Sequence, residues 1–264
     1  MPVLRSLPWL AALSGLALAA QAAAPLPPLP TQLACNPDAN TRWALSRDGS
    51  GTPRQVSVSV TAGTRECDFA SSGAPSALPG GGWRFDWQDE VLGQRQRVEV
   101  QPAGDGFRLT PQPAACGALR LPATVTLAPK AAGCTVSVDR DGAFEQFWQQ
   151  LRDALARQDG ERLQQLSMPQ LEFVEGPDIV KAPASVMRRA ARCLPRVTAT
   201  TRPIELRDLL KPEQAPRLDM PPLSRKGDSR IDFAGAMSLR WTAQGWRMDG
   251  FNTSRDVFEK CPAP

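Results

Sequence analysis

The stretch that decides the fold is residues 141–169, DGAFEQFWQQLRDALARQDGERLQQLSMP. Its apolar side chains recur at helical spacing, at Phe144, Phe147, Trp148, Leu151, Ala154 and Leu155. A stripe of this period predicts an amphipathic helix with one buried face. Asp141 is expected to cap its N-terminus, because a carboxylate there can accept from unpaired backbone N–H groups. Asp159-Gly160 interrupts the stripe, and Asp159 can cap a second, short helix.

The residues after this helical pair predict a sheet and a further helix. Residues 171–174 read as a strand, and Pro183 opens a helix expected to reach Leu194. The alternation from Ile231 to Trp241 predicts one long strand with Gly235 as a possible bulge, and residues 242–251 complete a hairpin. Between them we expect a strand at 197–201, a short helix or turn at 204–210 and a proline-rich loop at 211–224.

The first half of the chain predicts only strands. Short alternating runs separated by glycine-rich turns are expected to form strands at 41–46, 55–60, 83–87, 95–100, 107–110, 118–127 and 134–138. Many short strands of this kind favour a small antiparallel sandwich or open barrel. We identify no family resemblance for this half.

The chain therefore divides into four predicted segments. Residues 1–22 have a positive end at Arg5, a short apolar run and the small-x-small sequence Ala20-Gln21-Ala22, which together indicate a secretory signal peptide of the Sec type. Residues 23–33 form a proline-rich linker, expected to be extended and exposed. Residues 34–138 are expected to form a disulfide-supported β domain, and residues 139–264 an α+β domain with helices packed on a curved antiparallel sheet.

Export makes the six cysteines readable as a disulfide set: Cys35, Cys67, Cys116, Cys134, Cys193 and Cys261. Six cysteines allow about fifteen pairings, and the sequence does not choose among them. Chain order favours Cys35–Cys67, Cys116–Cys134 and Cys193–Cys261, which keeps every bridge within one predicted domain. No C-x-x-C occurs, so neither a redox pair nor a zinc knuckle is indicated.

Composition narrows the possible functions. The formal net charge of +4 is too small to argue for a nucleic-acid partner. The chain contains no histidine and no tyrosine, which removes Ser-His-Asp and Cys-His catalysis and histidine-bound metals. We therefore expect no cofactor and no metal. No later stretch is apolar enough for a membrane span, so we also expect no stable span after the signal is cleaved.

The second half resembles the NTF2-like (SnoaL-like, cystatin-like) α+β superfamily. The resemblance lies in F144-x-x-F147-W148-x-x-L151, in D159-G160-x-x-x-L163-x-x-L166 and in the final hairpin L239-R240-W241-x-x-x-G245-W246-R247-M248. It implies a long and a short helix packed into a curved sheet, with a cone-shaped pocket between them. Many enzymes of this superfamily use Asp/His pairs in that pocket, and a chain without histidine departs from that pattern.

Several residues are weak candidates for a site in such a pocket. Asp232, Asp249 or Glu172 could act as a base if burial raised its pKa. Trp148, Trp241 and Trp246 could bind an apolar ligand, although core packing is the favoured explanation of them. Arg188 and Arg192, with Arg189 and Arg196, could bind an anion, although basic helix faces are usually only solvated.

These observations favour a periplasmic or secreted bacterial protein that is a non-catalytic binding or interaction module. A small apolar or anionic molecule in the C-terminal cone is the expected ligand. Two alternatives stay open. One is a histidine-independent isomerase, dehydratase or hydrolase, and the other is a structural or inhibitor-type protein that docks an envelope partner through its β domain.

Overall fold

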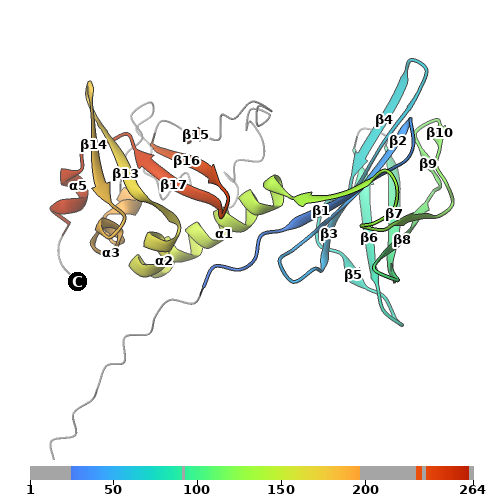
Figure 1. Ribbon diagram of the computed structural model, residues 1–264, viewed down its shortest axis with the longest axis horizontal. Coiled ribbons are helices and arrows are strands. Elements are labelled where there is room, and N and C mark those ends of the chain that lie inside the picture. The colour runs from blue at the N-terminus through green and yellow to red at the C-terminus, as the bar shows by residue number, and fades with distance from the viewer. Residues whose placement is uncertain (1–24, 91–92, 197–229, 234–235, 262–264) are drawn as a thin grey trace, which may run out of the picture.

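The computed structural model describes residues 25–90, 93–196, 230–233 and 236–261. Over these residues the chain is mostly β, with several antiparallel sheets and few helices. Two separate hydrophobic clusters lie in it, one built by the strands before residue 139 and the other by the helices and strands after it. Helix α1 and the strand leading into it connect the two parts (Figure 1).

Two five-stranded antiparallel sheets enclose the first cluster. One has the order β12 (Cys134–Val138), β1 (Thr31–Asp38), β2 (Thr41–Arg47), β3 (Pro53–Ala62) and β4 (Arg65–Ala70). The other has the order β11 (Val125–Leu127), β8 (Gly106–Gln112), β7 (Gln94–Ala103), β6 (Trp83–Asp89) and β5 (Ser76–Ala77). A short hairpin of β9 (Ala115–Cys116) and β10 (Leu119–Arg120) accompanies them. Alternation explains the core: Val56, Val58 and Val60 of β3 are buried.

Strands β1, β4, β5 and β9 lie where the sequence predicts none, and the expected strand over 118–127 is divided into β10 and β11. The proline-rich linker is also shorter than predicted, because residues 31–33 belong to β1. Leu33 of that strand is fully buried against Leu45 of β2, which draws the segment into the first sheet.

In the second part, helices pack on one five-stranded sheet. The helices are α1 (Arg140–Arg157), α2 (Gly160–Gln165), α3 (Val186–Ala190), α5 (Asp256–Glu259) and a 3-10 turn at Leu194–Arg196. The sheet has the order β14 (Asp178–Pro183), β13 (Ser167–Glu175), β17 (Gly245–Phe251), β16 (Met237–Thr242) and β15 (Arg230–Phe233). The expected stripe of α1 is buried and packs on β17.

Four predicted details of this part are wrong. Asp139, not Asp141, caps α1, because the helix begins at Arg140 and the Asp139 carboxylate accepts from Gly142 N at 3.0 Å. The third helix is shorter than predicted, since Pro183 still belongs to β14. The sheet is mixed, because β13 and β17 are not joined directly and run parallel. The long strand over 231–241 is two strands, β15 and β16, which pair with Phe233 opposite Met237, so the chain reverses between them.

The predictions at 197–201, 204–210 and 211–224 and the Gly235 bulge lie outside the described residues. The predicted signal peptide, residues 1–22, also lies outside them. No helix in the described ranges is long and apolar enough to cross a membrane.

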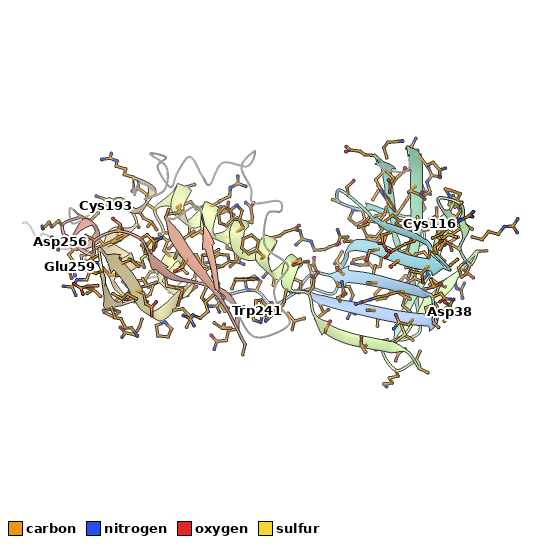
Figure 2. The ribbon with its side chains drawn as sticks, turned by 90° about the horizontal axis from the view of Figure 1, so that it is seen from above. Asp38, Cys116, Cys193, Trp241, Asp256 and Glu259 are labelled. Carbon is orange, nitrogen blue, oxygen red and sulfur yellow. A yellow bond between two sulfur atoms is a disulfide. The ribbon has the colours of Figure 1, made fainter. Side chains whose placement is uncertain are left out.

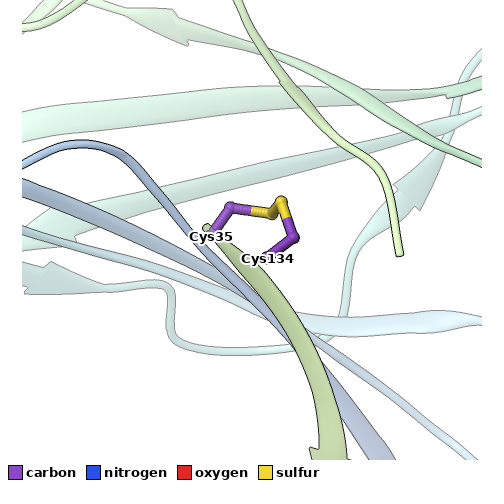
Figure 3. The surroundings of a disulfide bond; sticks show 2 residues. All are labelled: Cys35 and Cys134. Carbon is purple, nitrogen blue, oxygen red and sulfur yellow. A yellow bond between two sulfur atoms is a disulfide. The ribbon is translucent and has the colours of Figure 1, made fainter. Parts of the chain in front are cut away.

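All six cysteines form disulfides, as Cys35–Cys134, Cys67–Cys116 and Cys193–Cys261. Figure 3 shows the first of these, which joins β1 to β12. The pairing suggested by chain order is right for Cys193–Cys261 and wrong for the other two. Cys35 and Cys67 lie on strands separated by β2 and β3, about 14 Å apart at the usual strand spacing, which a disulfide cannot reach. Three intramolecular disulfides point to an oxidising, non-cytoplasmic compartment.

Candidate functional site

The most distinctive local feature is the proline-rich segment before β1, residues 25–30 (PLPPLP), which we call the strap. Proline fixes its own φ and restricts the preceding residue, so this sequence favours an extended polyproline II conformation. The strap belongs to neither a helix nor a strand. The predicted exposure holds only in part: Pro25, Pro27 and Pro28 are exposed, whereas Leu26 and Leu29 pack against the C-terminal cluster and Pro30 is buried.

The strap lies in a groove between α1 and the start of β17. Gln146 of α1 donates from Nε2 to Pro28 O at 3.3 Å and to Pro27 O at 3.5 Å. At the end of the strap, Asp139 N donates to Pro30 O at 3.0 Å. The strap is therefore held by side-chain and backbone donors as well as by its leucines.

Gly245 lets the strap approach the β16–β17 turn. Thr242 Oγ1 donates to Gly245 O at 2.8 Å and shapes this turn. Gly245 has a φ of +96°, and a Cβ there would lie 2.7 Å from Leu29 Cδ2. The backbone conformation thus favours glycine at this position, and a Cβ would also displace the end of the Leu29 side chain.

Two adjoining hollows border the strap. The smaller, about 20 Å³, has room for about one water molecule and lies between the strap, α1 and Trp246. The larger, about 500 Å³, is an open hollow along the strap. Its lining residues are Pro25, Leu26, Pro27, Pro28, Leu29, Gln165, Ala243, Gln244 and Arg247. Arg247 lines both hollows and supplies the cationic group of this site.

Arg247 is a half-buried guanidinium with no carboxylate partner in the described part of the chain. Its Nη1 donates to Trp246 O at 2.7 Å. Burial lowers the pKa of Arg247, although an arginine stays ionised at neutral pH. Arg240 lies directly opposite in the β16–β17 ladder and takes the carboxylate of Asp249. The site can therefore accept an anion beside an apolar wall of proline and leucine side chains.

The predicted carboxylates lie elsewhere on the C-terminal sheet. Asp249 is only 3% exposed and accepts from Arg240 at both oxygens, each at 2.9 Å. Glu172 on β13 lies 3.8 Å from Lys181 Nζ. Neither residue lines a hollow beside the strap. Asp232 lies on β15, and its side chain is outside the described residues.

The three candidate tryptophans differ in their surroundings. Trp148 is buried and stacks on Phe144 at 5.8 Å between ring centroids. Trp246 is buried as well, donates from Nε1 to Arg140 O, and borders the smaller hollow. Trp241 is half-buried, with Arg140 over its ring at 5.0 Å, and lies where the two parts of the chain meet (Figure 2). Among the described residues, Phe144, Trp148 and Trp246 thus pack together between α1 and the sheet.

The arginines of the third helix do not form a common site. Arg188 pairs with Glu161 at 2.8 Å, and Arg192 is exposed beyond the end of α3. Neither lines a hollow beside the strap. Among the residues that the structure places, no group of three or more Cys, Asp or Glu side chains could hold a metal ion.

The chain matches no protein-family model, no curated protein and no solved structure. The site must therefore be interpreted from its own geometry. Sequence reasoning missed Arg247 and the strap, and the signal that could have found the strap is the Leu-x-x-Leu spacing within its prolines. Arg247 lies in the final hairpin of the family resemblance, and among the described residues only its lack of a carboxylate partner in the fold distinguishes it.

Proposed function

We propose that this is an exported, non-catalytic binding module whose site is the open hollow beside the strap. The ligand class that fits is a small carboxylate, or another anion, with an apolar body. One observation carries the proposal: Arg247 is half-buried, faces the hollow and has no carboxylate partner among the described residues. The proposal keeps the small-molecule ligand expected from the sequence but places it outside the helix–sheet core.

The physical argument is that a buried charge is costly unless it is paired. A guanidinium presents five N–H donors in a planar fork that matches a carboxylate, and the structure uses one Nη of Arg247 on a backbone carbonyl. An anion in the hollow would compensate the remaining charge. The prolines and leucines of the strap would contact the apolar part of the ligand.

We also infer that the two hydrophobic clusters correspond to two domains, a β-sandwich and an α+β domain of the NTF2-like kind. Support for the latter comes from the element order: two helices, a hairpin, a helix and then three strands. The last of these strands, β17, pairs with β13, the first strand of the hairpin. Residues 1–22 are proposed as the signal peptide and the periplasm as the destination, in agreement with the three disulfides.

The enzyme alternative has weaker support. Asp249 already holds Arg240 in a two-point ion pair, and it lines neither hollow beside the strap. Glu172 faces Lys181 across the β13–β14 pair.

A specific observation favours docking through the first part as a second candidate function. β12 is an edge strand whose Val136 and Val138 are 48% and 44% exposed, on the face that carries the buried Leu33 and Leu45. Residues 134–138 carry no charge, whereas the opposite edge, β4, carries Arg65, Glu66 and Asp68. Such an edge can pair with another strand, and an antiparallel second copy of β12 fits because it brings no like charges together. Sedimentation of the wild type and Val136→Lys tests this, and a monomer at all concentrations contradicts it.

The anion site can be tested with the mature chain and three probes: sodium benzoate, sodium octanoate and inorganic phosphate. Calorimetry and tryptophan fluorescence should detect saturable binding of at least one carboxylate, because Trp246 borders the smaller hollow. Arg247→Gln should weaken that binding at least about tenfold. Arg192→Gln is the matched control and should bind like the wild type. Equal affinity in Arg247→Gln, or no saturable binding of any probe, would reject the proposal.

A further inference from the structure

We propose that the seat of the strap is a recognition groove for polyproline II peptides, and that the strap occupies it as a built-in competitor of a proline-rich segment from a partner protein. The groove is the surface formed by α1 and the β16–β17 turn under residues 25–30. The partner segment is expected to resemble the strap that binds there: uncharged and extended, with leucines three residues apart that are flanked by proline.

The spacing of the leucines matches the conformation that prolines impose. A polyproline II helix has three residues per turn, so Leu26 and Leu29 project on the same side. Both pack against the C-terminal cluster. The wall beneath them is apolar and partly aromatic, with Ala143, Phe147 and Trp246 lining the hollow below the strap. Aromatic-lined grooves are a recurring way to bind proline-rich segments.

The backbone of such a segment also needs donors. Polyproline II has no internal hydrogen bonds, and its carbonyls are free to accept from a receptor. Gln146 meets this need with one amide group that faces two successive carbonyls, those of Pro27 and Pro28. The groove thus contacts both the leucine side chains and the backbone carbonyls of the segment that it binds.

The strap is tethered to the groove through its covalent continuation into β1. A tethered segment competes at a high effective concentration, so a free peptide must displace it. The intact chain is therefore expected to bind a proline-rich peptide more weakly than a chain whose strap cannot dock. This proposal does not require anion binding at Arg247, because the peptide needs no charge, but the two sites share the strap, which lines the anion hollow.

The experiment uses the mature chain with Leu26→Ala and Leu29→Ala, which keeps the strap but removes the side chains that dock it. The probe is the peptide Pro-Leu-Pro-Pro-Leu-Pro, blocked at both ends, and the matched control is the same peptide with both leucines replaced by alanine. We expect saturable binding of the leucine peptide to the double variant. The alanine peptide should bind the double variant at least about tenfold more weakly than the leucine peptide does. The leucine peptide should likewise bind the intact chain at least about tenfold more weakly than it binds the double variant. Gln146→Ala in the same background should weaken the leucine peptide.

Equal binding of the two peptides, or none to a folded double variant, would overturn the proposal. Circular dichroism establishes folding, and a chain that begins at Pro30 is the second variant if the first does not fold. A wild-type dimer that the leucine peptide dissociates would overturn the assignment to a partner, because the occupant would then be the strap of a second copy. Binding of the uncharged leucine peptide to the double variant should be the same with and without inorganic phosphate, which separates this test from that of the anion site.

Discussion

Cys35 and Cys134 lie directly opposite each other in the β1–β12 ladder, with their Cα atoms 4.0 Å apart. The next backbone pair beyond them is joined by a hydrogen bond from Asn36 N to Gly133 O at 2.9 Å. In antiparallel sheets the pairs between such hydrogen-bonded positions approach most closely, and a disulfide can bridge them. The bridge joins residues 99 positions apart and holds an edge strand to its sheet.

This connectivity predicts the result of peptide mapping. Digestion of the unreduced protein should yield a linked pair of peptides that carry Cys35 and Cys134, and mass spectrometry should lose that pair on reduction. Cys67 should be recovered with Cys116. A peptide pair joining Cys35 to Cys67 would contradict the arrangement of the first sheet.

The start of α1 gives a second prediction. Asp139→Ala should destabilise the protein by about 1 kcal/mol, because it removes the acceptor for Gly142 N. Asp141→Ala should change the free energy of unfolding by less than about 0.5 kcal/mol. Desolvation, and after it repulsion from Asp139, raises the pKa of Asp141, so its charge is not favoured by the fold. Urea unfolding of both variants measures the difference, and equal losses would contradict the assignment of the cap.

Removing either partner of the Arg240–Asp249 ion pair on the last hairpin should lower the free energy of unfolding by a different amount. Arg240→Ala leaves a carboxylate that is only 5% exposed without its main partner and should cost about 3 kcal/mol. Asp249→Ala leaves an arginine side chain that is 38% exposed and can reach water, so it should cost about 1–2 kcal/mol. Thermal and urea unfolding compare them. A larger loss for Asp249→Ala would mean that the carboxylate has another structural role.

The turn between β2 and β3 predicts a dependence on pH. Burial raises the pKa of Asp48, but hydrogen bonds from the Ser50 side chain and from the backbone of Thr52 and Ser50 outweigh it and lower the pKa. A carboxyl whose pKa is lower in the folded state stabilises the protein above its unfolded pKa, and this contribution is lost as the pH falls through the folded pKa. Asp48→Ala should therefore cost about 1–2 kcal/mol at pH values of about 5 to 8 and progressively less below about 4. Denaturation across this range tests the sign, and a loss that grows at low pH would refute it.

A buried amide in the first cluster gives a further prediction. Gln96 is 1% exposed and lies opposite Trp87, and its Nε2 has no hydrogen-bond partner among the described residues. Gln96→Met keeps the volume and removes this donor, so it should be neutral or stabilise by up to about 1–2 kcal/mol. Gln88→Met, at an exposed position on β6, is the control. A loss above about 1 kcal/mol in Gln96→Met alone would show that the amide makes a contact that matters.

The elements predicted correctly are those with a strong local signal. The stripe from Phe144 to Leu155 predicts α1 because helical period and burial coincide over several turns. Alternation predicts β3 and β6 because its period of two residues coincides with the burial of alternate side chains. Alternation cannot separate one strand from two that reverse tightly, so it predicts a single strand where the structure has the β15–β16 pair.

The candidate site depends on contacts that no local pattern encodes. Proline-rich composition predicts an extended linker, and the strap is extended, but its docking depends on an opening between α1 and β17 that exists only in the fold. Arg247 looks like any strand arginine in the sequence, because its lack of a counter-ion depends on Arg240 taking the nearby carboxylate. Disulfide partners are likewise set by strand order, which is a long-range property.

The bridge between β1 and β12 has a mechanical consequence. When the two ends of the chain are pulled apart, the strap peels first, and the load then enters at Thr31 and leaves at its neighbour Val138. The two strands can unzip only as far as Cys35 and Cys134, where the covalent bond carries the tension across. Residues 36–133 therefore lie outside the force path. Cys193 and Cys261 shield residues 194–260 in the same way, so an extension trace should show only the segment between Cys134 and Cys193 unravelling until a reductant is added.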